Sequence, residues 1–195
     1  MKKVTFQDIK NIADYEKIRK SSIASVIETK KQRRISLGDK ISLVFETPLT
    51  VLSQIQEIMR VERIVEEANI QHEIDVYNQL LPDHDNELRA TLFIEITDPD
   101  AIKHDLDKMM GIDSSKHIYI QVGSQQIFAQ FEGGHSNEIK LSAVHYTSFM
   151  FDSEQFSAFR NIDLPAYLIS NHPNYKAKVL LETTVRESLV HDLGL

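Results

Sequence analysis

Apolar residues recur every three or four positions across residues 49–67, the spacing that places them on one side of an α-helix. This apolar side consists of Val51, Leu52, Ile55, Ile58, Met59 and Val65. Pro48 suits the first turn, so the pattern predicts a helix over 49–67. Glu62 projects into the middle of the apolar side, and Glu66 lies beside it one turn later. Because burying an unpaired carboxylate is costly, we expect both acids to lie at the edge of the stripe, paired, protonated or bound to a metal.

The rest of the chain divides into further helices and strands. Helical spacing predicts helices over 6–30, 70–80, a segment of about ten residues from Asp98-Pro99-Asp100 to Gly111, 153–160 and 174–192. Alternation predicts strands over 35–46 (a strand or a hairpin turning at Gly38-Asp39), 88–96, 117–122, 126–132 and, after a turn at Gly133-Gly134, 138–151. Since no regular βαβ alternation occurs, we predict an α+β fold. It is expected to be a single domain over 1–195, with a largely antiparallel sheet of about five strands, helices packed on one face, and the helical segment 5–30 at the periphery.

Composition narrows the class of protein. Hydrophobic residues make up 42% of the 195 residues and charged residues 26%, as in ordinary globular domains. The formal net charge of −7 argues against a nucleic-acid binder. No apolar run is long enough to span a membrane, and the N-terminus lacks the apolar core of a signal peptide. Because the chain has no cysteine, it offers no thiolate nucleophile or disulfide. We therefore expect a soluble cytoplasmic protein that binds neither nucleic acid nor membrane.

One histidine lies within an apolar pattern. Alternation along 138–151 places His145 on the same side as Leu141, Phe149 and Phe151. A histidine there can be a core residue with a neutral hydrogen bond. If Glu62 or Glu66 packs against the same face, two carboxylates and an imidazole would suit a divalent metal ion or proton transfer.

Structural ion pairs are the alternative explanation for the two acids. An arginine nearby would neutralise Glu62 or Glu66, and the candidates are Arg33, Arg34, Arg60 and Arg63. The sequence has no H-E-x-x-H, no G-x-S-x-G, no P-loop and no G-x-G-x-x-G motif. Nucleophilic acyl transfer and nucleotide binding by a known motif therefore lack support.

Two motifs of the chain are distinctive: QIQEIMRVE, which runs from Gln54 to Glu62, and SAVHYTSF, which runs from Ser142 to Phe149. In these motifs the chain resembles an uncharacterised bacterial domain-of-unknown-function family of about 200 residues. Tyr15, Arg19, Tyr77-Asn78 and His172-Pro173 add to the resemblance. Members are often encoded beside rubrerythrin-like proteins and iron–sulfur oxidoreductases. The resemblance thus implies a place in redox or peroxide-stress metabolism and a redox protein as partner.

Three functions follow from these observations. The leading hypothesis is an accessory or binding protein that acts with a redox partner. The competing hypothesis is a metal-dependent or acid–base enzyme with a pocket containing Glu57, Arg60, Glu62, Tyr77 and His145. Glu62, Glu66 and His145 are its candidate metal ligands. The third is a homo-oligomeric structural protein that associates through the apolar stripe of 49–67.

Overall fold

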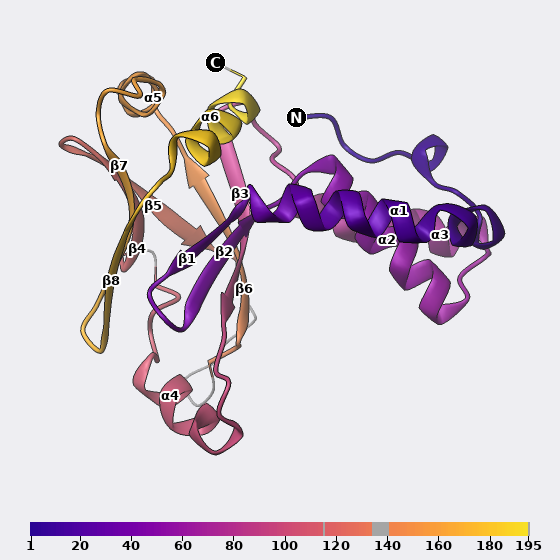
Figure 1. Cartoon of the computed structure of the whole chain (residues 1–195), viewed down its shortest axis with the longest axis horizontal. Helices are drawn as coiled ribbons and strands as arrows, with labels where there is room; N and C mark the ends of the chain where they lie inside the picture. The colour runs from indigo at the N-terminus through magenta and orange to yellow at the C-terminus, as the bar shows by residue number, and fades with distance from the viewer. Residues whose placement is uncertain (115, 134–140, 195) are drawn as a thin grey trace.

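The computed structural model describes residues 1–114, 116–133 and 141–194, which form a mixed helical and sheet structure (Figure 1). The α-helices are α1 (Ile12–Lys31), α2 (Pro48–Glu62), α3 (Glu67–Tyr77), α4 (Ile102–Lys108), α5 (Ser153–Arg160) and α6 (Thr183–Asp192). Short 3-10 helices are η1 (Phe6–Asp8), η2 (Asn78–Leu80) and η3 (Pro99–Ala101). The strands are β1 (Arg34–Leu37), β2 (Ile41–Phe45), β3 (Glu87–Ile94), β4 (Ile118–Val122), β5 (Gln125–Phe131), β6 (Val144–Met150), β7 (Ala166–His172) and β8 (Tyr175–Leu180).

The described strands form one antiparallel sheet in the order β1-β2-β3-β6-β5-β4-β7-β8. The prediction of an antiparallel sheet is confirmed, but that of about five strands is wrong. One reason is that 35–46 supplies two strands, paired around Gly38. In addition, the helix predicted over 174–192 begins only at Thr183, and β8 occupies the residues before it. No strand was predicted over 166–172, where the structure has β7. In β8 the side chains alternate between half-buried and exposed, as in a strand. Residues such as lysine, alanine and leucine in this segment are also common in helices, so the alternation was not recognised.

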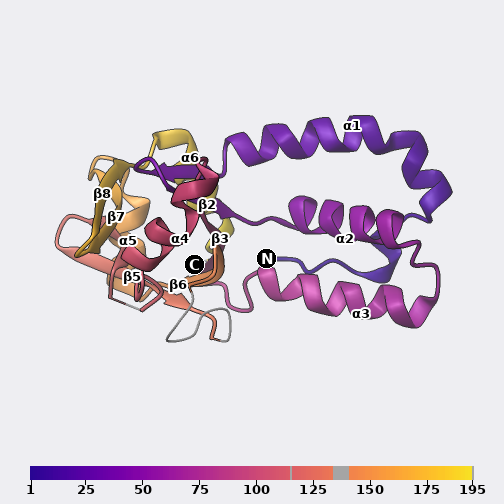
Figure 2. The same ribbon diagram turned by 90° about the horizontal axis from the view of Figure 1, so that it is seen from below.

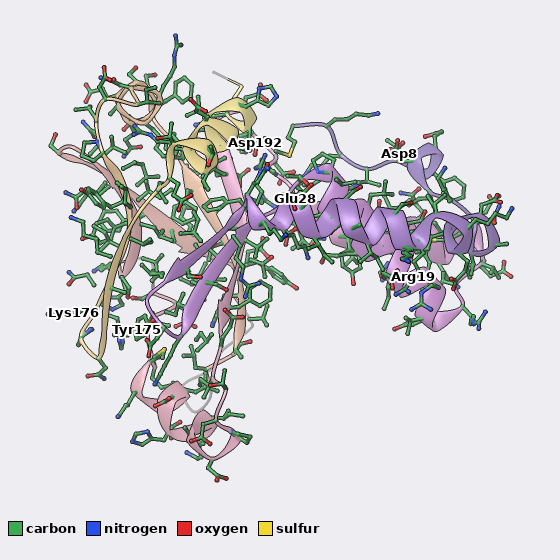
Figure 3. All side chains as sticks on the ribbon, viewed as in Figure 1. Asp8, Arg19, Glu28, Tyr175, Lys176 and Asp192 are labelled. Atoms are coloured by element: carbon green, nitrogen blue, oxygen red, sulfur yellow. The ribbon has the colours of Figure 1, made fainter. Side chains whose placement is uncertain are left out.

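The sheet curls until its two edge strands approach each other. The Tyr175 hydroxyl on β8 donates to the Leu37 carbonyl at 2.8 Å and accepts from the Lys40 amide at 3.0 Å (Figure 3). These bonds join β8 to the β1–β2 hairpin and leave a barrel-like shape. Its interior is the main core, which includes Leu37, Leu43, Leu92, Ile120, Ile127, Phe149 and Leu168.

Three helices build a second layer beside the sheet rather than a cover over one of its faces. Figure 2 shows α1, α2 and α3 side by side, extending away from the strands. Their shared core contains Val4, Val51, Ile55, Met59, Ile70, Ile74 and Leu81. In Figure 1, α5 and α6 lie near one end of the sheet and α4 near the other. The prediction of helices on one face is therefore wrong. Because the stripe of α2 is buried here, it is not an exposed surface for oligomer formation.

Helix α2 ends five residues before the predicted boundary. Arg63 adopts a left-handed conformation with φ +58°, and the amides of Arg63 and Ile64 both donate to the Met59 carbonyl. Glu66 then precedes the first residue of α3 as its N-cap. The predicted pairing of Glu62 and Glu66 on one helix face is therefore wrong, and both side chains are exposed.

Two predictions extend beyond the described residues. The turn predicted at Gly133-Gly134 and the first part of the strand predicted over 138–151 include residues outside the described ranges. Within those ranges, none of the helices has the length and apolar character needed to cross a membrane.

Candidate functional site

The structure does not bring the five predicted pocket residues together. His145 is fully buried on β6, where its Nε2 lies 2.8 Å from the Ser142 carbonyl oxygen. Its ring meets Phe131 edge-on at 5.7 Å between centroids. The side chain therefore faces the sheet core, as in the core-histidine interpretation, and does not reach Glu62 or Glu66.

Glu57 lies between α1 and α2, where three side chains contact its carboxylate. Arg19 donates to both carboxylate oxygens at 2.8 and 2.9 Å, and the Tyr15 hydroxyl donates at 2.7 Å. Arg60 donates from one turn along α2 at 3.3 Å, and it also pairs with Glu16. Arg60 is thus held by two carboxylates rather than presented to an anionic substrate.

The Arg19 guanidinium lowers the pKa of the Glu57 carboxyl from 4.5 to about 2, against the opposing effect of burial. Because the folded-state pKa is lowered, this carboxylate stabilises the protein above pH 4.5 and loses that contribution as the pH falls toward 2. The cluster therefore joins α1 to α2 and contributes to the packing of the helical layer.

The lowered pKa of Glu57 gives a testable prediction. Glu57→Gln is expected to lower the free energy of unfolding by about 1–2 kcal/mol at neutral pH, a figure reduced for solvent screening. The deficit should shrink between pH 4.5 and about 2, where wild-type Glu57 becomes protonated. Urea denaturation across pH measures it, with Glu187→Gln, exposed on α6, as the charge-matched control. A deficit that stays constant with pH would contradict this assignment.

Glu62 and Tyr77 meet in a separate cleft, which we call the α2–α3 cleft. It has a volume of about 350 Å³ and lies where the helical layer adjoins β5 and β6. It is lined by Ile58, Glu62, Glu73, Val76, Tyr77, Gln79, Leu80, Glu132 and Tyr146. The carboxylates therefore come from α2, from α3 and from the residue after β5.

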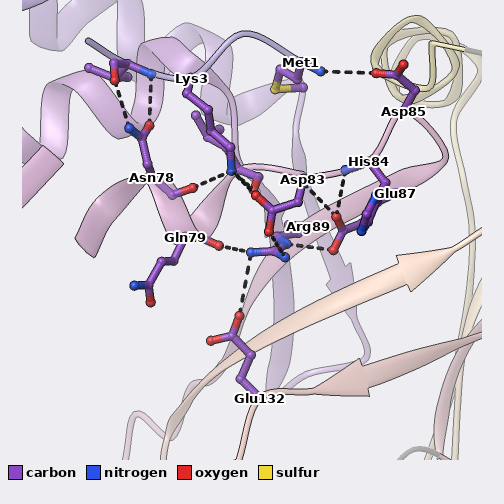
Figure 4. A network of polar contacts seen from close by, with 12 residues as sticks. Met1, Lys3, Asn78, Gln79, Asp83, His84, Asp85, Glu87, Arg89 and Glu132 are labelled. Carbon is purple, nitrogen blue, oxygen red and sulfur yellow. Dashed lines mark hydrogen bonds and ion pairs between the residues drawn. The ribbon is translucent and has the colours of Figure 1, made fainter. Parts of the chain in front are cut away.

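The charges in this cleft are unequally compensated. Glu132 lies 3.9 Å from the Arg89 guanidinium, which also pairs with Glu87 and Asp83 (Figure 4). Glu62 and Glu73 form no ion pair with any residue that the structure describes. Burial raises the pKa of the Tyr77 hydroxyl, and the charges of Glu73 and Glu62 raise it further. Tyr77 therefore stays protonated at neutral pH and presents a hydrogen-bond donor beside two carboxylates.

The three predicted metal ligands, Glu62, Glu66 and His145, lie in three different places. Across residues 1–114, 116–133 and 141–194, no group of three or more histidine, aspartate or glutamate side chains is arranged to hold a metal ion. Glu62 lies in the α2–α3 cleft, Glu66 is exposed at the start of α3, and His145 lies in the core.

Of the acids and tyrosines that line the cleft, three were not predicted from the sequence: Glu73, Glu132 and Tyr146. Glu73 and Tyr77 are four residues apart, which places them on one face of α3, so this signal was available. Tyr146 alternates with His145 on β6 and hence points to the outer side of the sheet. No local sequence pattern connects Glu132 to Glu62, Glu73 and Tyr77, because the pairing of β5 with β6 brings Glu132 to the α2–α3 cleft.

Comparisons with known proteins agree with the fold but supply no activity. A family model described as a protein of unknown function (DUF3501) matches residues 3–193. A crystal structure described as a novel protein of unknown function from Burkholderia pseudomallei K96243 is similar over 98% of this chain and 100% of its own. The sequence identity is 28% and the TM-score 0.88. No curated protein matches the chain.

Proposed function

This chain belongs to the DUF3501 family of proteins of unknown function, and we propose that it is a binding protein that holds a small organic cation in the α2–α3 cleft. The observation that carries this proposal is the lining of the cleft. Three glutamates and two tyrosines line it together with apolar side chains, and no lysine, arginine or histidine is among the described lining residues.

Each part of the lining suits a different part of an organic amine. The carboxylates of Glu62 and Glu73 attract a positive charge and accept its N–H hydrogen bonds. The rings of Tyr77 and Tyr146 favour a cation near their faces. Ile58, Val76 and Leu80 provide contacts for a carbon skeleton. A ligand with one or two ammonium groups on a short apolar body fits this chemistry best.

The enzyme hypothesis has weaker support from the geometry. It needs Glu57, Arg60 and His145 around one pocket with Glu62 and Tyr77. The first two are engaged with α1, and His145 lies in the core. Binding without a complete catalytic arrangement agrees better with these positions.

Calorimetric titration with putrescine, cadaverine, histamine and tyramine tests the proposal. At least one amine should bind, and Glu73→Gln should weaken its binding about tenfold, the effect of losing roughly 1.4 kcal/mol of charge interaction. Glu187→Gln makes the same charge change away from the cleft and should leave the affinity unchanged. The proposal fails if none of the amines binds, or if Glu73→Gln and Glu187→Gln have equal effects.

Two expectations from the sequence remain proposals. A redox protein partner rests on the family resemblance alone, and co-purification under reducing and oxidising conditions would test it. A cytoplasmic location agrees with the lack of cysteine, because such a chain needs no oxidising compartment to fold.

A further inference from the structure

One half of the sheet presents its outer side away from the helical layer. The residue after β2 and the 3-10 helix η2 contact the outer side of β3: the Thr91 hydroxyl donates to the Glu46 carboxylate, and the Arg89 guanidinium donates to the Gln79 carbonyl. Strands β8, β7, β4 and β5 lie on the opposite side of the molecule from α1, α2 and α3 (Figure 1). Leu168, Ile120 and Ile127 point inward on these strands, so the alternating positions point outward.

We call these outward positions the free sheet face. They are Tyr119, Gln121, Gln126, Phe128, Gln130, Tyr167, Ile169, Asn171, Lys176, Lys178 and Leu180. None of them is acidic, although the chain contains 29 aspartates and glutamates. The face therefore differs in charge from the rest of an acidic protein.

The centre of this face is apolar and aromatic. Across the four strands Lys178 pairs with Ile169, Ile169 with Tyr119 and Tyr119 with Phe128. The Tyr119 and Phe128 rings are 5.2 Å apart, and Phe128 remains 39% exposed. Lys178 Nζ lies 3.8 Å from the centre of the Tyr167 ring. Aromatic residues enriched at the centre and acids depleted are the composition of a protein–protein interface.

We propose that the free sheet face is the contact between two copies of this chain in a homodimer. With a net charge of −7, two copies repel when their acidic surfaces meet. Two copies that meet on this face place no carboxylates opposite each other, because the face contains no acidic side chain. Under two-fold symmetry the same residues serve both subunits, so the lysines of β8 can lie over aromatic rings of the partner subunit.

This inference is independent of the α2–α3 cleft, which is lined by α2, α3, η2 and residues at β5 and β6. It also replaces the stripe of 49–67 as the expected contact surface. The net charges of the two subunits still repel each other, so added salt should screen this repulsion and strengthen association. An interface held by ion pairs would instead weaken as salt is added.

Sedimentation-velocity centrifugation over a concentration series tests it. We expect a monomer–dimer equilibrium with a Kd of about micromolar order, tighter at higher salt. Phe128→Glu should raise the Kd at least tenfold, because each subunit then places a carboxylate in an apolar contact. Val65→Glu is the matched control, since Val65 is 67% exposed and lies between α2 and α3, in the helical layer that extends away from the strands.

A monomer at every concentration overturns the inference, as does a dimer that Phe128→Glu leaves intact. Circular dichroism on both variants establishes that each is folded. Glu73→Gln should leave the dimer Kd unchanged, so failure of the cleft proposal and failure of the dimer proposal are distinguishable.

Discussion

Replacing Gly38 by alanine is expected to destabilise the protein by about 3 kcal/mol, or a fall in Tm of roughly 6–12 °C. Gly38 turns the β1–β2 hairpin with φ +76°, a conformation that strains an L-residue. A Cβ at this position would also lie 2.5 Å from the Tyr175 hydroxyl and 3.1 Å from Ala177 Cβ. The hydroxyl would have to move, and the bonds that join β8 to β1 would be lost. Thermal denaturation followed by circular dichroism measures the change.

Gly111 provides a matched control for backbone strain. It has φ +84°, but a Cβ there would meet no atom within 4 Å. Gly111→Ala should therefore cost only the strain of the left-handed conformation, about 1–2 kcal/mol. In a Tyr175→Phe background the excess cost of Gly38→Ala over Gly111→Ala should shrink, because the hydroxyl is already absent. Equal costs for the two alanines in the wild-type background would show that Tyr175 does not hold the sheet edges together.

Arg33→Met is expected to destabilise the protein by about 3–5 kcal/mol, the cost of leaving a buried charge without its partner. The Arg33 guanidinium pairs with both oxygens of Asp192, and each side chain is only 9% exposed. Asp192 ends α6, where the helix dipole disfavours a negative charge, so the arginine is its main compensation. Asp192 lies 159 residues from Arg33 in the sequence, and Figure 3 shows it near the start of β1. Chemical denaturation gives the free energy directly.

A double replacement separates the two parts of this cost. Arg33→Met with Asp192→Leu removes both charges and should recover most of the lost stability. Lys17→Met, which removes an exposed ion pair with Asp14, should change stability by less than about 0.5 kcal/mol. If the double variant is as unstable as Arg33→Met alone, packing around the guanidinium rather than charge explains the loss.

Three of the four arginines expected beside Glu62 or Glu66 form ion pairs with other acids. Arg33 and Arg34 pair with Asp192 and Glu95, and Arg60 pairs with Glu57 and Glu16. None of them neutralises Glu62, which leaves that carboxylate available in the α2–α3 cleft. Glu62 thus keeps its negative charge in the cleft because these arginines pair with other acids.

The candidate site was predictable in part. Periodicity identified Glu62 as an unusual acid, and the resemblance added Tyr77; both line the cleft. The prediction that Glu66 shares a helix face with Glu62 is wrong because α2 ends at Glu62, and the left-handed cap that follows is Arg63 rather than a glycine that would mark the end. His145 was correctly placed on the apolar side of its strand, but that side faces the core rather than the cleft.

Many of the local elements of this protein follow from sequence patterns alone, although β7 and β8 do not. Helical and alternating periods, with glycines at Gly38 and Gly123, specify α2, the β1–β2 hairpin and the β4–β5 hairpin, because these patterns act over a few residues. The path of the sheet, the separate helical layer and the placement of Glu62 and Tyr146 in one cleft depend on the tertiary structure. These contacts join segments that are distant along the chain, and such pairing depends on burial and strand register rather than on local spacing.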